Sequence, residues 1–163
     1  MEQEFRELYV ARAPALRRTA FLLCGSWHQG EDLVQVAFSK LFASWGRARH
    51  PEAYLRQVLV RTWVDETRRP HRRERLTAQL PDVAASPGDC LEDRDLLRTA
   101  LAAVPPRQRA CLVLRFYEDL SVAETAFVLG CTEGTVKSQT SRGLDALRLV
   151  LSSTDPELVK EPT

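Results

Sequence analysis

The chain is 163 residues long, with 44% hydrophobic residues, 28% charged residues and a formal net charge of +1. This composition can form a packed interior, so it argues against wholesale disorder and predicts a soluble globular protein. The sequence has no apolar run of about 20 residues and its start, MEQEFRELYV, lacks a basic-then-apolar leader, which argues against membrane insertion and secretion and favours the cytoplasm.

Apolar residues recur at helical spacing along the chain, and no segment shows the alternation that is typical of a strand. In the N-terminal half this pattern starts at Phe5 and predicts about four helices, with a basic loop, GRARHPEA, between the third and the fourth. The C-terminal half is expected to hold about four shorter helices. The sequence therefore predicts an all-α protein made of two small helical domains.

The helix predicted from Asp32 to Trp45 carries polar side chains beside an apolar stripe. Such a helix can pack inward on one side and offer its other side to a partner. A face that is merely solvated is an equal alternative. The candidate partner-binding residues are Asp32, Gln35, Ser39 and Lys40.

Positive charge is concentrated between Arg47 and Arg75, where the sequence has nine arginines and four acidic residues. Sites that hold unstacked bases combine cationic and aromatic side chains, and this stretch also contains Tyr54 and Trp63. Either ring could equally belong to the core, and Trp63 is expected there. The basic run that begins at Arg68 suits DNA phosphates and gives little choice of sequence. The candidate residues for this DNA site are Arg47, Arg49, His50, Tyr54, Gln57, Arg61, Arg68 and Arg69, with Arg56, Arg72, Arg73 and Arg75 as further cations.

The segment from Leu80 to Leu91 contains two prolines, a glycine, and small and acidic residues. Such a composition buries little surface and predicts a flexible tether. Between Leu76 and Leu97 the sequence has five acidic residues and one arginine, so the tether is also acidic. We expect domains over residues 1–75 and 94–152, a flexible acidic linker over 76–93 and a disordered tail over 153–163.

The stretch from Ser121 to Arg148 predicts two helices separated by a tight turn. Ser121 and Glu124 have the spacing of a capping box, which fixes where the first helix begins. Gly130 suits the left-handed conformation that ends a helix, and Thr132 is a good N-cap for the second helix.

A helix-turn-helix requires a small residue where the helices cross, a glycine in the turn and an apolar anchor in the second helix. Ala126, Gly130 and Val136 stand at this spacing. An inner stripe that continues through Thr140 leaves the opposite side of the second helix polar. An ordinary helical hairpin with a polar exterior is the alternative. The residues expected to face a major groove are Glu133, Thr135, Lys137, Ser138, Ser141 and Arg142.

Together these motifs resemble the bacterial RNA polymerase sigma factors of the extracytoplasmic-function group, and within it the actinobacterial sigma-E branch. Pro105, Arg109 and the stretches LRFYEDLS, ETAFVLG and GTVKS are similar to region four of that family. Upstream, DLVQVAFSKLFASW resembles region 2.2, and PEAYLRQVLVRTWVDETRR resembles regions 2.3 and 2.4. The chain departs from the family at Val36, where an acidic residue is common, and at Arg61, where an asparagine is common.

The resemblance implies a transcription initiation factor that binds core RNA polymerase and directs it to promoter DNA. It assigns the minus-thirty-five element to the helix-turn-helix and the minus-ten element to the N-terminal domain, whose basic loop would capture a flipped base. It also implies that Asp32, Gln35, Ser39 and Lys40 meet the polymerase clamp, that the acidic linker passes near nascent RNA, and that an anti-sigma factor is a further partner. Twenty arginines against three lysines favour a GC-rich, actinobacterial genome.

The sequence argues against an enzyme, because it contains no phosphate-cradling glycine loop, nucleophile constellation or metal cluster. Its four cysteines lie far apart and its three histidines are scattered, so no metal or cofactor is expected. Two alternatives remain open. One is a response-regulator-like output domain, although no receiver domain is visible. The other is a degenerate sigma relative that only sequesters a partner protein.

Overall fold

The computed structural model describes residues 1–69 and 91–154, with side chains from residue 95 onward in the second stretch. The chain divides into two compact units, Met1–Ala84 and Ala85–Thr163. The secondary structure of the described residues is helical and contains no strand, which confirms the predicted all-α fold. Most of the predicted linker and tail lie outside the described residues, as do Arg72, Arg73 and Arg75.

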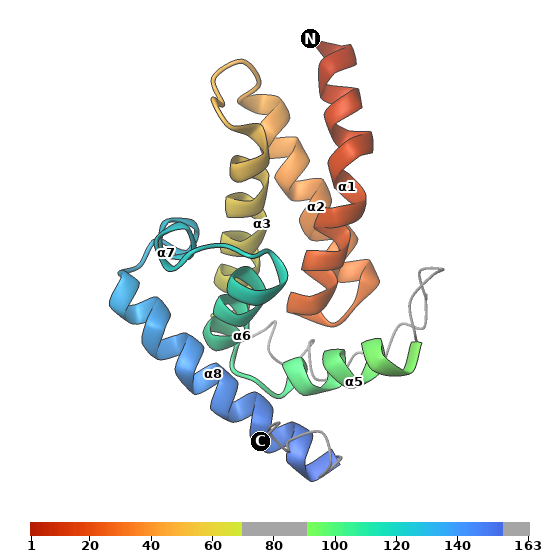
Figure 1. Cartoon of the computed structure of the whole chain (residues 1–163). Helices are drawn as coiled ribbons and strands as arrows, with labels where there is room; N and C mark the ends of the chain where they lie inside the picture. The colour runs from red at the N-terminus through yellow and green to blue at the C-terminus, as the bar shows by residue number, and fades with distance from the viewer. Residues whose placement is uncertain (70–90, 155–163) are drawn as a thin grey trace. The chain divides into compact units, whose positions relative to one another are not determined.

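Three helices form the described part of the first unit: α1 (Glu2–Cys24), α2 (Trp27–Ala43) and α3 (Pro51–Thr67). Figure 1 shows them packed side by side, and the short connections make neighbouring helices antiparallel. Gly25 adopts the left-handed conformation that ends α1, with φ 75°. The Ser26 hydroxyl then accepts a hydrogen bond from the Gln29 backbone N–H at 3.3 Å, which starts α2.

The position of the basic loop in this unit differs from the expectation. It was predicted between the third and the fourth helix, but among residues 1–69 it lies between the second and the third. The reason is that α1 continues through Pro14, so the apolar residues before and after it belong to one helix. Pro14 is exposed, so the carbonyl that loses its N–H partner lies on the solvent side of α1. Helix α2 also begins earlier than predicted, at Trp27 instead of Asp32.

The core of the first unit is mainly aliphatic, and aromatic rings gather where α1 meets the end of α2. Trp63 is 2% exposed, so its predicted place in the core is confirmed. Phe5 meets three rings edge-on, with centroid distances of 6.0 Å to Phe38, 5.1 Å to Phe42 and 5.3 Å to Trp45. These contacts hold the start of α1 beside the loop that follows α2.

The second unit contains α5 (Leu91–Ala102), α6 (Pro106–Leu112), a π-helical turn η1 (Val113–Tyr117), α7 (Val122–Leu129) and α8 (Glu133–Thr154). Helix α5 begins inside the predicted linker, and α8 extends into the predicted tail. The guanidinium of Arg109 joins α5 to α6, since Nη2 donates to the carbonyls of Ala102 at 3.1 Å and Val104 at 2.9 Å. Arg109 therefore closes the C-terminal end of α5.

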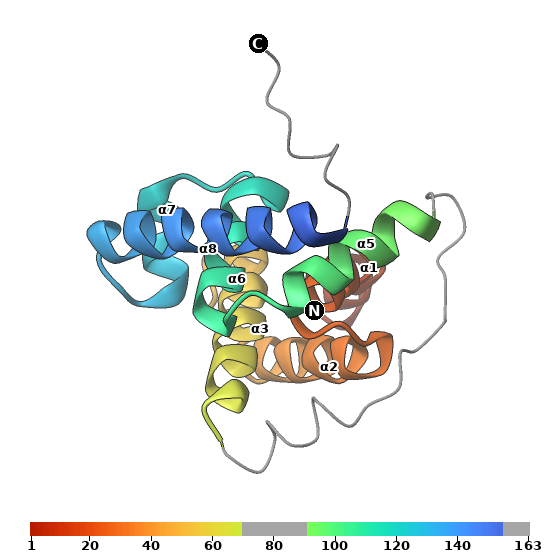
Figure 2. The same ribbon diagram turned by 90° about the horizontal axis from the view of Figure 1, so that it is seen from below.

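Helix α8 passes across α6 (Figure 2), and the two backbones approach closely. The close approach depends on Gly143, because a Cβ atom there would lie 3.1 Å from Leu112 Cγ and 3.3 Å from Gln108 Cβ. Helix α7 packs on the N-terminal part of α8 through a core that contains Cys111, Ala126 and Val136. Both neighbours therefore fix the position of α8.

Candidate nucleic-acid interface

The first helix of the predicted helix-turn-helix begins and ends where the sequence placed its boundaries. The Ser121 hydroxyl accepts a hydrogen bond from the Glu124 N–H at 3.0 Å, and the Glu124 carboxylate accepts one from the Ser121 N–H at 3.1 Å. The capping box is therefore confirmed. Gly130 has φ 67°, and the next N–H, of Cys131, donates to the Ala126 carbonyl at 3.0 Å.

The second helix starts at the predicted N-cap, because the Thr132 hydroxyl accepts a hydrogen bond from the Thr135 N–H at 3.1 Å. One residue later, Val136 is fully buried, as expected for the apolar anchor. Thr140 lies one turn further on the same side and is half-buried, with its hydroxyl donating to the Val136 carbonyl at 2.6 Å. The inner side of α8 is thus packed, and its opposite side remains open.

The predicted groove-facing residues lie mainly on this open side of α8. Thr135 is half-buried instead, and its hydroxyl lies 2.9 Å from the Thr132 hydroxyl, so part of its hydrogen-bonding capacity is used in the cap. The Ser138 hydroxyl donates to the Thr135 carbonyl at 3.1 Å and thus turns back toward its own helix. Long cationic side chains are the strongest candidates for base contacts here. The exposed members of the set are Glu133, Lys137, Ser138, Ser141 and Arg142.

The predicted minus-ten residues fall into two groups that are separated along α3. The first group surrounds the loop at residues 44–50, where α3 starts at Pro51 immediately after His50. Arg68 and Arg69 follow the other end of α3, roughly 20 Å away from Tyr54 along the helix axis. One base-binding pocket cannot include both groups. The exposed residues are Arg47, Arg49, His50, Arg61, Arg68 and Arg69, and the half-buried ones are Tyr54, Arg56 and Gln57.

The two aromatic candidates of this region have different surroundings. Trp63 is buried in the core and is therefore unavailable for stacking on a base. Tyr54 is half-buried, and its hydroxyl lies 3.3 Å from the Ser44 hydroxyl at the end of α2. Tyr54 thus ties α3 to the base of the loop and keeps part of its ring accessible.

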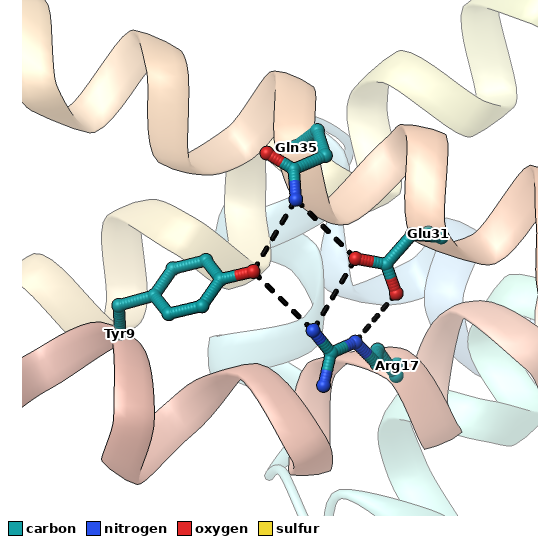
Figure 3. A network of polar contacts seen from close by, with 4 residues as sticks. All are labelled: Tyr9, Arg17, Glu31 and Gln35. Atoms are coloured by element: carbon teal, nitrogen blue, oxygen red, sulfur yellow. Dashed lines mark hydrogen bonds and ion pairs between the residues drawn. The ribbon is translucent and has the colours of Figure 1, made fainter.

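The predicted polymerase-binding residues share one exposed face of α2. Their spacing over a little more than two turns places them on the same side of the helix. Figure 3 shows that Gln35 also belongs to a closed ring of four polar side chains between α1 and α2. The exposed residues of this face are Asp32, Gln35, Ser39 and Lys40.

The polar ring was missed by the sequence analysis. Arg17 of α1 donates from Nε to Glu31 Oε2 at 2.5 Å and from Nη2 to Oε1 at 3.3 Å. The Tyr9 hydroxyl accepts hydrogen bonds from Arg17 Nη2 and Gln35 Nε2, both at 3.3 Å. Gln35 Nε2 also donates to Glu31 Oε1 at 3.3 Å. The only signal in the sequence is helical spacing: Tyr9 and Arg17 are eight residues apart in α1, and Glu31 and Gln35 are four residues apart in α2.

The ring makes the stability of the first unit depend on pH. Hydrogen bonds from Arg17 lower the pKa of the Glu31 carboxyl, and the same contact raises the pKa of Arg17. Because the folded state favours the ionised carboxylate, this stabilisation is complete above the ordinary pKa and is lost as pH falls through the folded-state pKa. The pair is partly exposed, so we expect Glu31→Gln to lower the free energy of unfolding at pH 7 by less than about 1 kcal/mol.

Urea unfolding at a series of pH values checks this expectation. The ordinary pKa of a glutamate carboxyl is 4.5, and below this pH the difference in free energy of unfolding between wild type and Glu31→Gln should shrink. The control is Glu4→Gln, which removes an exposed carboxylate from the same helix as Arg17. If the difference in free energy of unfolding between wild type and Glu31→Gln is constant across the whole pH range, the polar ring does not make stability depend on pH.

The chain matches known proteins in both units. Residues 8–74 match Sigma-70 region 2, and residues 94–147 match Sigma-70, region 4. The chain is 39% identical over 158 residues to the RNA polymerase sigma-E factor of Streptomyces avermitilis, covering 93% of this chain and 87% of the relative. It is 33% identical over 163 residues to the ECF RNA polymerase sigma factor SigL of Mycobacterium tuberculosis, covering 90% and 88%. The chain belongs to the extracytoplasmic-function sigma factors.

The likeness to this sigma family extends to a solved structure. The sigma factor RpoE of Bartonella quintana, in complex with the anti-sigma factor NepR, superposes with a TM-score of 0.73 at 26% identity, covering 92% of this chain and 98% of that one. The predicted resemblance is therefore confirmed, and the chain is a promoter-directing RNA polymerase sigma factor, in a family that is not a class of enzymes. In the part of the chain that the structure describes, no helix combines the length and hydrophobicity needed to cross a bilayer.

Proposed function

We propose that this sigma factor recognises the minus-thirty-five element with the exposed side of α8. The observation that supports this assignment is the open polar face at the start of α8, opposite the fully buried Val136. Lys137 and Arg142 project from this face, and both can donate hydrogen bonds to a guanine edge or a phosphate. The capped turn before α8 holds that face rigidly, as a base-reading helix requires.

The minus-ten element is assigned to the loop between α2 and α3. Arg47, Arg49 and His50 are exposed there, and Tyr54 lies beside them with part of its ring accessible. Cations near an aromatic ring are typical of a site for unstacked bases, so this group is proposed to hold the flipped base. Arg68 and Arg69 are proposed to contact the phosphates of adjacent DNA, because they lie too far along α3 to join the same pocket. Arg61, an exposed arginine about two turns after Tyr54, is proposed to contact phosphates with them.

Core RNA polymerase is proposed to dock on the exposed face of α2 described above. Residues 1–75 and 94–152 would then act as two DNA-binding modules of one initiation factor, joined by residues 76–93.

An anti-sigma factor is a further proposed partner, because the Bartonella quintana relative was solved with one. We also propose that the protein works in the cytoplasm, where polymerase and promoter meet, and that it performs no catalytic step itself.

Transcription with purified components tests the proposed function. Core polymerase plus this chain should give run-off RNA from promoters that the holoenzyme itself selects from a DNA library. Scrambling either the minus-ten or the minus-thirty-five element should reduce the product by at least about tenfold. Core polymerase without the chain is the control. Binding to core polymerase without promoter-dependent RNA would favour a degenerate sigma relative that only sequesters its partner.

A further inference from the structure

The turn that leads into the helix-turn-helix is formed by the LRFYEDLS stretch. The π-helical turn η1 closes with a hydrogen bond from the Glu118 N–H to the Val113 carbonyl at 3.0 Å. The Leu120 N–H then donates to the Leu114 carbonyl, also at 3.0 Å. Between them, Asp119 has φ 54°, a left-handed conformation that non-glycine residues rarely adopt. A closely hydrogen-bonded reversal thus connects η1 to α7.

Arg115 adds a side-chain contact across this reversal. Its Nη1 donates to the Leu120 carbonyl at 2.5 Å, in a partly buried position. Leu120 is 9% exposed and stands immediately before Ser121, the N-cap of α7. The carbonyl of a residue before the N-cap receives no bond from within the helix, so its partner must come from elsewhere. Arg115 is that partner, and its positive charge strengthens the hydrogen bond.

The position at which α7 starts affects the position of α8. Helix α7 is short, covering Val122–Leu129, and a single capped turn connects it to α8. The two helices share the core around Ala126 and Val136. Helix α8 is independently held against α6 at Gly143. The orientation of α8 is therefore determined at two places, the crossing at Gly143 and the turn that Arg115 closes.

We propose that Arg115 is a positioning residue for minus-thirty-five recognition. By bonding the Leu120 carbonyl, next to the capping box of Ser121 and Glu124, it holds the start of α7 in place, and through α7 it sets the angle at which Lys137 and Arg142 meet the major groove. The inference rests on the proposed function of α8. Because Arg115 Nη1 donates to the backbone of its own turn, this role needs no contact between Arg115 and a base.

The test compares three variants in holoenzyme. Arg115→Met removes the donors and keeps much of the side-chain length, whereas Arg115→Lys keeps a charge and one donor that can reach a carbonyl. Arg107→Met removes an exposed arginine from α6 of the same unit and is the matched control. For each variant, binding to a promoter selected by wild-type holoenzyme is compared with binding to the same promoter with a scrambled minus-thirty-five element. Thermal unfolding is followed by circular dichroism.

We expect Arg115→Met to reduce the preference for the matched element by about tenfold, while binding to scrambled DNA stays within about twofold of wild type. Arg115→Lys should recover most of the preference, and Arg107→Met should keep all of it. The assays are run well below the unfolding temperature of every variant. A merely structural role would lower that temperature without changing the preference of the folded protein.

Three results would overturn the positioning role. The preference of Arg115→Met could equal that of wild type. Its binding could fall equally on both DNAs with a shallower salt dependence, which would make Arg115 a phosphate contact. Its preference could also return on further cooling, which would attribute the loss to unfolding. If wild-type holoenzyme itself shows no preference for the matched element, the proposed function of α8 fails instead.

Discussion

Replacing Arg142 with alanine is expected to weaken holoenzyme binding to a matched minus-thirty-five element by about 1 to 3 kcal/mol. Arg142 is exposed on α8, nearly three turns beyond the capped start of the helix, and its guanidinium can donate two parallel hydrogen bonds to one guanine. Because such bonds depend on the base, the loss should be large on the matched element and small on DNA that lacks the preferred base pair.

Binding titrations on a set of minus-thirty-five elements, each with one base pair changed, measure this dependence. Arg148→Ala is the matched control, since Arg148 is an exposed arginine of the same helix that lies further from its N-terminal end. If Arg142→Ala loses the same free energy on every DNA, Arg142 contacts a phosphate. In that case Lys137 becomes the remaining cation of this face that can select a base.

The helix-turn-helix could be predicted in detail because its boundaries depend on local chemistry. The capping box of Ser121 and Glu124, the left-handed Gly130 and the Thr132 cap each involve residues within a few positions of one another. The buried Val136 follows from the same helical spacing. Short-range signals of this kind are fully present in a single sequence.

Contacts between distant residues could not be predicted in the same way. Arg17 and Glu31 lie in different helices, and only packing of α1 on α2 shows that they meet. Arg109 and Arg115 donate to backbone carbonyls, and a sequence does not state which carbonyls lack a partner. The unbroken α1 is a further case, because the exposed position of Pro14 is a property of the folded unit.

The minus-ten site shows why residue type alone was insufficient. Tyr54 and Trp63 are both aromatic residues in a basic stretch, and although Trp63 was expected in the core, the sequence left open whether Tyr54 is a base platform or a core residue. Burial separates them, since Trp63 is enclosed by the bundle while Tyr54 remains half-buried beside the loop. The same stretch of sequence therefore contributes to both the core and the surface of the first unit.

Replacing Trp63 with alanine should lower the free energy of unfolding of the first unit by about 3 to 5 kcal/mol, because the indole is 2% exposed and its loss leaves a large cavity. Trp63→Phe keeps a ring in the core and should cost clearly less. Urea unfolding measures both losses, and a permanganate footprint of the minus-ten region measures promoter opening by the corresponding holoenzymes. At a temperature where Trp63→Phe is fully folded, opening should equal that of wild type. Impaired opening by this folded variant would mean that Trp63 contacts DNA directly, and that the core around it rearranges in the open complex.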